Sequence, residues 1–201
     1  MTAKLYRHEL SGHAHRVELF LSLLGKEYDL INVDLAAGEH QTESFLKLNP
    51  FGQVPVLVDG DVTLSDSTAI LVYLAEKYGK QWLPEDPVGR ALVQRWLSVA
   101  SGEVASGPGA ARLVTLFKAP IDHELAKSKA HRLLKLLENH LKDSVFLAST
   151  RPTIADIAVY TYVAHAPEGD VPLTDYPLVR SWLERLEALP KFVGMKQTAI
   201  V

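Results

Sequence analysis

Apolar positions in the first part of the chain change between the spacing of strands and the spacing of helices. Residues 5–7 predict a short strand, and Ser11 and Gly12 then open a helix whose apolar face recurs every three or four positions up to Gly25. Residues 28–35 alternate loosely between apolar and polar side chains, which predicts a second strand. A strand, a helix and a second strand in this order predict a right-handed parallel crossover.

A hairpin is expected next, after a short helical segment at residues 44–48. Asn49-Pro50 and Gly52 mark a turn, because proline fixes φ and glycine permits positive φ. Residues 54–58 predict a buried strand, and Asp59-Gly60 forms the turn from which the chain returns as a fourth strand.

A third helix is expected to begin at residues 65–67 and to end at Gly79. The order β-α-β-α-β-β-α predicts a small mixed sheet covered by helices, as in the thioredoxin-like fold. The stretch 81–87 contains two prolines and predicts a linker between this α/β domain, residues 1–80, and a second domain, residues 88–201. The second domain is expected to be all-helical, with helices around residues 92–104, 131–141, 153–164 and 178–189.

Composition and charge limit the kinds of partner. The 201 residues suffice for one large domain or two small ones, and 47% of them are apolar. A net charge of −3 gives no basis for binding nucleic acid, and no apolar run approaches the roughly 20 residues that span a membrane. The absence of cysteine excludes disulfides, a cysteine nucleophile and thiolate metal ligands. The residues after Met1 lack the apolar segment of a signal peptide, so a cytoplasmic protein is expected.

Residues 49–55 (Asn-Pro-Phe-Gly-Gln-Val-Pro) and 64–67 (Leu-Ser-Asp-Ser) place a strand edge beside the start of a helix. This arrangement suits a small, extended, anionic peptide, because the first backbone N–H groups of a helix are unpaired. The two stretches resemble the glutathione-binding region of the cytosolic glutathione S-transferases, and the resemblance covers nearly the whole chain. Within that superfamily the chain is similar to bacterial members that use a serine, of the theta and zeta type.

The resemblance implies a transferase that joins the glutathione thiolate to small hydrophobic electrophiles, with glutathione as co-substrate and no metal or bound cofactor. Two other functions are open on the same fold. One is glutathione-dependent disulfide reduction or isomerisation at the same site, and the other is a non-catalytic glutathione-binding scaffold or regulatory protein. No sequence motif encodes the electrophile, because the shape of the pocket decides it.

The resemblance also implies a set of glutathione-binding residues: His40, Gln53, Val54, Pro55, Asp66 and Ser67. A cis Pro55 would leave the backbone of Val54 to pair with the cysteinyl unit as one more strand would. Ser67 would bind the γ-glutamyl carboxylate and Asp66 its amino group, while Gln53 and His40 would reach the glycyl end. Plainer interpretations stay open: an edge proline with a trans bond, a capping role for Asp66, and solvated side chains at the other two positions.

Ser11 is the candidate catalytic residue. It opens the first helix, where the serine-type members place the hydroxyl that activates the thiol. A hydrogen bond to sulfur and the positive helix terminus both favour the thiolate, and lowering a thiol pKa from about 8.5 to neutrality needs about 2 kcal/mol. Ser11 can also be a simple N-cap, and Tyr6 competes for the catalytic role because other classes use a tyrosine at the end of the first strand.

Three histidines, His8, His13 and His15, lie near the same turn. Their spacing fits neither a helical i, i+4 pair nor a recognised zinc pattern, so no metal site is expected. His13 is instead expected to border the thiol and to help orient the substrate.

The second domain is expected to line the electrophile pocket, with Glu103 and Arg112 as candidate residues. Pro108 stands between two glycines and is expected to kink or end the long helix there, with a plain loop as the default interpretation. Thr153 and Asp156 have the spacing of a capping box, which predicts a helix start and no chemistry.

Phe51 is expected to be exposed in the turn between Pro50 and Gly52. In several classes of the resembling family an aromatic residue from this loop inserts between helices of a partner's second domain. The resemblance therefore implies a homodimer in which Phe51 is buried twice, once in each direction.

Overall fold

The structure of the protein is a computed structural model that describes residues 2–198. The chain forms two compact units. Within the described residues, the first contains the chain from residue 2 to Lys80 together with Pro190–Lys196, and the second contains Gln81–Leu189 together with Gln197 and Thr198.

The last segment is the main difference between these units and the predicted domains, 1–80 and 88–201. Residues 190–196 belong to the first unit. The imidazole Nε2 of His15, in the first helix, lies 2.9 Å from the carbonyl oxygen of Val193 and ties this segment down. Sequence periodicity does not reveal such a contact, because the segment forms neither a helix nor a strand.

The first unit is built on a four-stranded mixed sheet, whose spatial order is β2-β1-β3-β4. The strands are β1 (Ala3–Arg7), β2 (Tyr28–Asn32), β3 (Val56–Asp59) and β4 (Val62–Ser65). β1 runs parallel to β2 and antiparallel to β3, and β3 and β4 form the predicted hairpin. β2 ends before the predicted residue 35, because Asp34 starts a turn in which its carboxylate accepts the N–H of Ala37 at 2.9 Å. β3 begins only at Val56, because Pro55 has no N–H to donate to the sheet.

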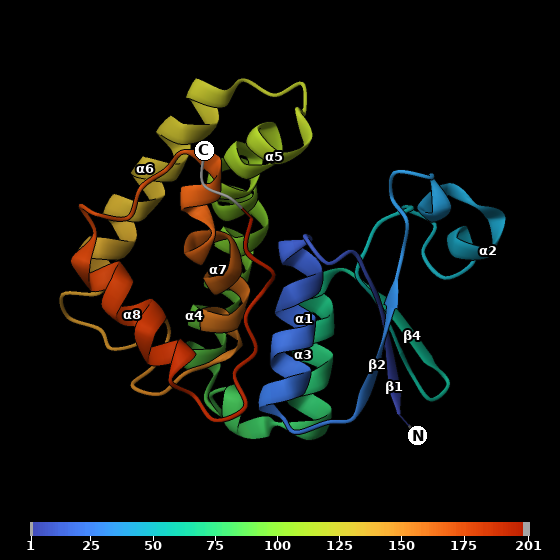
Figure 1. Ribbon diagram of the computed structural model, residues 1–201. Helices are drawn as coiled ribbons and strands as arrows, with labels where there is room; N and C mark the ends of the chain where they lie inside the picture. The colour runs from blue at the N-terminus through green and yellow to red at the C-terminus, as the bar shows by residue number, and fades with distance from the viewer. Residues whose placement is uncertain (1, 199–201) are drawn as a thin grey trace. The chain divides into compact units, whose positions relative to one another are not determined.

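Helices cover both faces of this sheet. They are α1 (Gly12–Leu23), η1 (Glu39–Gln41), α2 (Glu43–Leu46) and α3 (Ser67–Tyr78). Figure 1 shows α1 and α3 side by side on one face, with α2 on the other. Leu5, Phe20 and Ile70 are fully buried in β1, α1 and α3. A smaller apolar cluster on the other face contains Phe45 of α2 and Val56 of β3.

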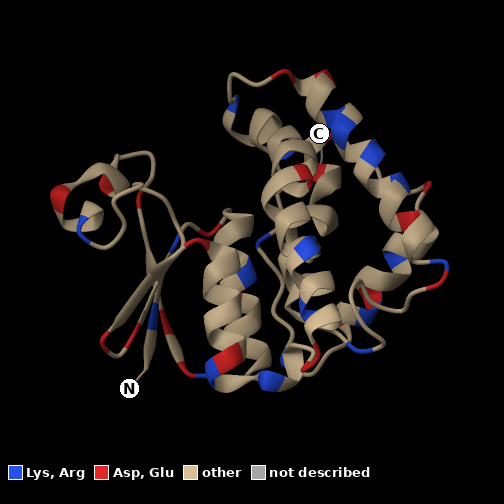
Figure 2. Ribbon diagram, turned by 180° about the vertical axis from the view of Figure 1, so that it is seen from behind, with Lys and Arg blue, Asp and Glu red and all other residues tan. Residues whose placement is uncertain are grey.

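The second unit is helical throughout, as predicted. Its elements are α4 (Pro87–Val99), η3 (Ala100–Gly109), α5 (Ala110–Phe117), α6 (His123–His140), α7 (Ile154–Ala164), η4 (Ala166–Gly169) and α8 (Pro177–Glu187), and the short turn η2 (Lys80–Trp82) precedes them. All residues of α7 from Ile154 to Val163 are buried, whereas α6 carries several charged residues along its length, as Figure 2 shows. Among the described residues, no helix combines the length and the apolar character that crossing a membrane requires.

The chain does not form a loop at Pro108, and the helix does not end there. η3 is a π-helical segment that continues α4 into α5 without a break. A π-helix is wider than an α-helix and so tolerates a residue that donates no hydrogen bond. Gly107 lets this segment approach α6 closely, since a Cβ there would lie 3.0 Å from the backbone nitrogen of Ala130. The default expectation of a loop was therefore wrong.

The capping box at the start of α7 is confirmed. The Asp156 carboxylate accepts the backbone N–H of Thr153 at 2.9 Å, and the Thr153 hydroxyl accepts the N–H of Ala155 at 3.3 Å. The same carboxylate also accepts the N–H of Leu147 at 2.9 Å and the indole N–H of Trp182 at 3.0 Å. Asp156 thus joins the start of α7 to a loop and to α8.

Candidate functional site

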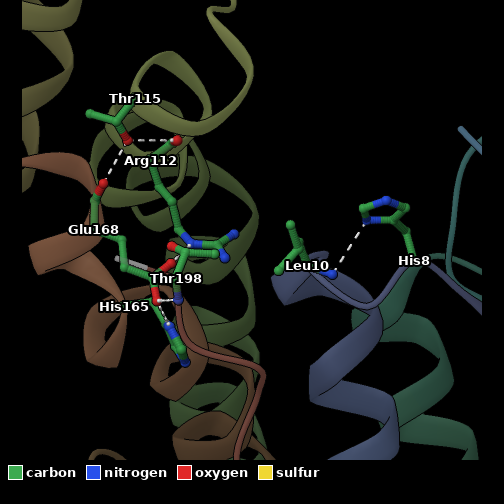
Figure 3. Close-up of polar contacts among 7 residues, drawn as sticks. All are labelled: His8, Leu10, Arg112, Thr115, His165, Glu168 and Thr198. Carbon is green, nitrogen blue, oxygen red and sulfur yellow. Dashed lines mark hydrogen bonds and ion pairs between the residues drawn. The ribbon is translucent and has the colours of Figure 1, made fainter. Parts of the chain in front are cut away.

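Ser11 lies at the N-terminus of α1, in extended backbone conformation. Its hydroxyl oxygen accepts the N–H of Ala14 at 3.2 Å, so it caps the helix. Its own N–H donates to the carbonyl of His8 at 2.9 Å, and Figure 3 shows the second bond of this turn, from the N–H of Leu10 to His8 Nδ1 at 3.3 Å. Within the described part of the chain the Ser11 hydroxyl donates no hydrogen bond, which leaves its O–H for a ligand.

Tyr6, the competing candidate, lies on the other side of the sheet from α1. Its ring packs edge-on against Phe45 of α2, with the ring centroids 6.4 Å apart. It also borders the apolar cluster that contains Val33 and Val56. Because neighbouring residues of a strand point to opposite faces, Tyr6 points away from the core of α1 and α3 that Leu5 joins.

The loop before β3 presents an open backbone edge. The peptide bond between Val54 and Pro55 is cis, as the resemblance implied. Among residues 2–198, neither the N–H nor the C=O of Val54 takes part in a hydrogen bond. The loop is held by the buried Asn49, whose amide donates to the carbonyl of Gln53 at 2.8 Å and accepts the N–H of Phe51 at 3.1 Å.

The remaining predicted residues of this region differ in exposure. Gln53 is exposed, and Phe51 is 80% exposed, as its place in the turn predicts. His40 is half-buried in η1, and its Nδ1 is buried without a hydrogen-bond partner among the described residues. A buried ring nitrogen of this kind favours a ligand or water that completes its hydrogen bonding.

The start of α3 combines a charged cap with a buried hydroxyl. Asp66 is the N-cap, and its carboxylate accepts the N–H of Ala69 at 2.9 Å and the hydroxyl of Thr68 at 2.6 Å. Partial burial opposes ionisation, but these hydrogen bonds outweigh it and lower the pKa of Asp66. Asp66 has a φ of 71°, which is unfavourable for a residue with a side chain and is found mainly where the surrounding structure enforces it. Ser67 follows as the first helical residue and is buried.

A buried arginine lies between the starts of α1 and α3. Arg16 is 0% exposed, and its Nη1 lies 2.8 Å from Nδ1 of His13 and 3.2 Å from the hydroxyl oxygen of Ser67. Burial and then the charge of Arg16 lower the pKa of His13 to about 4, against the opposing charge of Asp66. His13 is therefore neutral at pH 7 and lies beside the start of α3.

Glu103 and Arg112, the candidates for the electrophile pocket, belong to the second unit. Glu103 is exposed on η3. Arg112 is 1% exposed and pairs with Glu168 at 2.5 Å, inside the cluster that Figure 3 shows with His165 and Thr198. The structure does not support a place for Arg112 in a substrate pocket, because its guanidinium is enclosed and bonded.

Glu168 is the centre of this buried cluster. Its Oε1 lies 2.7 Å from His165 Nδ1 and accepts the N–H of Thr198 at 3.1 Å. Burial opposes ionisation of Glu168, but the hydrogen bonds from His165 and Arg112 lower its pKa to about 2. Burial lowers the pKa of His165, so this histidine is neutral at pH 7 and donates from Nδ1. The cluster is a structural element of the second unit.

Residues 2–198 contain no group of three or more histidine, aspartate or glutamate side chains placed to hold a metal ion. His8, His13 and His15 each have partners in the structure: the N–H of Leu10, Arg16 and the carbonyl of Val193.

Comparison with known proteins identifies the family of the chain. Residues 1–76 match the family model of the glutathione S-transferase N-terminal domain, and residues 115–190 match that of the C-terminal domain. Glutathione S-transferase 3 of Zea mays is 36% identical over 204 residues, which cover 94% of this chain and 90% of that protein. The chain belongs to the glutathione S-transferase family. Its recognition from the sequence is confirmed at the level of the superfamily.

Solved structures of glutathione S-transferases agree with the fold. A possible glutathione S-transferase from Rhodopseudomonas palustris superposes with a TM-score of 0.91 at 33% identity, covering 99% of this chain and 100% of that one. A glutathione transferase homologue from Drosophila mojavensis, solved with bound glutathione, has a TM-score of 0.84 at 32% identity, with 94% and 89% covered. The predicted fold class and the assignment as a glutathione S-transferase enzyme are confirmed.

Two buried residues that contact predicted residues of the candidate site, Arg16 and Asn49, are not among the predicted ones. Arg16 stands three and four positions before Leu19 and Phe20, on a helical face that is otherwise buried and apolar, and a charge at such a position indicates a buried interaction. Asn49 was interpreted only as a turn former, and its buried contacts with Phe51 and Gln53 leave no periodic signal in the sequence.

Proposed function

We propose that the chain is a serine-type glutathione transferase of the theta and zeta kind, which joins the glutathione thiolate to small hydrophobic electrophiles. Glutathione is the co-substrate, and the reaction needs no other cofactor. In this proposal Ser11 is the catalytic residue, and the protein acts as a cytoplasmic homodimer.

The observation that carries the proposal is the free O–H of Ser11 at the start of α1. Its oxygen already accepts the N–H of Ala14, so the hydroxyl hydrogen remains available to donate to a ligand. A sulfur atom placed there accepts this hydrogen bond and lies at the positive end of α1, and both effects favour the thiolate. The thiolate then attacks the electrophile and forms a C–S bond, while the leaving group departs with its electron pair.

Glutathione is proposed to bind along the loop and the start of α3. The unpaired backbone of Val54 pairs with the cysteinyl unit as an added strand. Ser67 and the first N–H groups of α3 bind the γ-glutamyl carboxylate, and Asp66 pairs with the amino group. Gln53 and His40 contact the glycyl end. A hydrogen bond from the ligand would satisfy the buried Nδ1 of His40, which has no partner among the described residues.

The proposal is tested with wild type and Ser11→Ala, each assayed with glutathione on an aryl halide, a mixed disulfide and maleylacetoacetate. We expect halide conjugation by the wild type and a loss of kcat of about 10- to 1,000-fold in the variant, as for loss of one hydrogen bond to a developing anion. The ultraviolet absorbance of the bound thiolate should appear at higher pH in the variant. Ser98→Ala, which removes a hydroxyl from α4 in the second unit, is the matched control.

Other outcomes contradict parts of the proposal. An unchanged thiol pKa in Ser11→Ala would transfer the catalytic role to another group, such as Tyr6. A preference of the wild type for the disulfide or for maleylacetoacetate would indicate reduction or isomerisation. Glutathione binding without turnover of any of the three substrates would indicate a scaffold.

A further inference from the structure

Arg16 is a charged side chain that is wholly enclosed between α1 and α3. Its exposure is 0%, and its Nη1 contacts His13 one turn earlier on α1 and Ser67 at the start of α3. Enclosing a guanidinium carries a large desolvation cost, so its position calls for an explanation by what it binds or orients.

The direction of both hydrogen bonds follows from chemistry. A guanidinium can only donate, so Nδ1 of His13 and the hydroxyl oxygen of Ser67 are the acceptors. His13 is neutral at pH 7, which places its proton on Nε2. The hydroxyl hydrogen of Ser67 cannot point back at Arg16, because that oxygen already faces a donor. Arg16 therefore selects the direction in which Ser67 donates.

We propose that Arg16 is a positioning residue for the α-carboxylate of the γ-glutamyl unit, because it turns the Ser67 O–H outward and adds a fixed positive charge behind the start of α3. The inference rests on the proposed function, which places that carboxylate at Ser67. Arg16 acts through Ser67, so it sets the affinity and selectivity for the γ-glutamyl end. It does not act on the thiol, which is several bonds away in glutathione and is assigned to Ser11.

The test removes the interaction in two ways: from the ligand, by deleting the α-carboxylate, and from the protein, by replacing Arg16. Two ligands are titrated calorimetrically into the full-length protein: glutathione, and 4-aminobutyryl-cysteinyl-glycine, which lacks only the α-carboxylate. We expect wild type to prefer glutathione by about 10- to 100-fold, the range of one charge-assisted hydrogen bond. Arg16→Gln should lose about tenfold or more in affinity for glutathione and little for the analogue, so that the preference largely disappears.

Kinetics provide a second readout. In Arg16→Gln the KM for glutathione should rise while kcat at saturation and the thiol pKa stay close to wild type, which is the reverse of the expectation for Ser11→Ala. Arg16→Lys keeps the charge but not the planar fork, and should retain an intermediate preference for glutathione. Arg112→Gln removes a buried arginine from the second unit and is the control, with an unchanged ratio of the two affinities.

The outcomes separate this inference from the proposed function. If Arg16→Gln weakened both ligands equally, the role of Arg16 would be structural and the inference wrong, with the proposed function intact. If Arg16→Gln failed to fold, Arg16→Lys would be compared in two backgrounds, wild type and Ser67→Ala. The inference requires that Arg16→Lys reduce the preference for glutathione over the analogue when Ser67 is present, and that it have no such effect in Ser67→Ala. If wild type bound glutathione and its analogue equally, the inference would be wrong, and if it bound neither, the proposed function would fail too.

Discussion

Asp156 is a fully buried carboxylate in the first turn of α7, and its replacement by alanine tests what holds the second unit together. Four hydrogen bonds end on its two oxygens. Oδ1 accepts the N–H of Leu147 at 2.9 Å and the indole N–H of Trp182 at 3.0 Å. Oδ2 accepts the N–H of Thr153 at 2.9 Å and its hydroxyl at 3.1 Å.

The expected loss of stability follows from the donors that alanine leaves behind. The hydroxyl of Thr153 can rotate to another acceptor, but the three N–H groups are fixed by backbone and ring. A buried donor left unsatisfied costs about 1–3 kcal/mol, so three of them set a range of about 3–9 kcal/mol. Local relaxation and water entry reduce the upper end, and point mutations rarely exceed about 5 kcal/mol. We expect Asp156→Ala to lower the free energy of unfolding by about 3–5 kcal/mol.

Urea unfolding followed by far-ultraviolet circular dichroism measures this loss as a shift of the midpoint. Thr153→Ala is the matched control, because it removes the helix cap and the hydroxyl contact with Asp156 but keeps the contacts of that carboxylate with Leu147 and Trp182, and it should cost about 1 kcal/mol. Trp182→Phe, which removes one of the donors together with its need for an acceptor, should cost less than Asp156→Ala. If Asp156→Ala cost no more than Thr153→Ala, the contacts to Leu147 and Trp182 would contribute nothing, and the reasoning would be refuted.

Three further predictions concern charge, packing and assembly. The pKa of Glu168 is lowered from 4.5 to about 2, so its ionised form contributes stability above pH 4.5 that is lost as the pH falls toward 2. The free energies of unfolding of wild type and Glu168→Gln should therefore differ by about 3 kcal/mol at neutral pH and converge between pH 4.5 and 2. A difference that stays constant with pH would contradict the stabilising role of the Glu168 charge. Gly107→Ala should destabilise the protein because its Cβ meets the backbone of α6, while Gly102→Ala, with nothing within 4 Å, should be neutral in the same thermal melt. Phe51→Ala should weaken the homodimer strongly in sedimentation, because burying each Phe51 at the interface contributes about 1.5–3 kcal/mol to association. A wild type that is monomeric at micromolar concentration would refute the dimer.

The parts of the fold that the sequence predicted well are those encoded by local patterns. The β3–β4 hairpin follows from Asp59-Gly60 between apolar runs, and the start of α7 follows from the spacing of Thr153 and Asp156. Both depend on residues that are close in sequence, so the physical signal lies within a short window. The family resemblance rested on such a window too, at residues 49–55 and 64–67.

The parts that it missed depend on contacts between distant segments. Pro108 lies inside a π-helical segment, and Gly107 beside it allows α6 to approach closely; no local pattern in the sequence reveals this distant partner. Arg112 lies in the same helical stretch, and its partner Glu168 is 56 residues away in η4. The sequence alone does not show whether a charged side chain contacts a ligand or a buried residue of opposite charge. In the folded protein, Arg112 contacts the buried carboxylate of Glu168.

The candidate site has a physical logic that joins its two ends through one helix. α1 begins with Ser11, which the proposal places at the thiol, and five positions later carries Arg16, which contacts Ser67 at the proposed γ-glutamyl end. A rigid helix thus fixes the distance between the group that activates sulfur and the group that orients the carboxylate. In this proposal the two tasks are divided along α1, because Arg16 and Ser67 contribute binding at the carboxylate end while activation of the thiol is left to Ser11. Changes in the apolar face of α1, such as Phe20, would disturb both ends at once, whereas a change at Arg16 is felt at the carboxylate end alone.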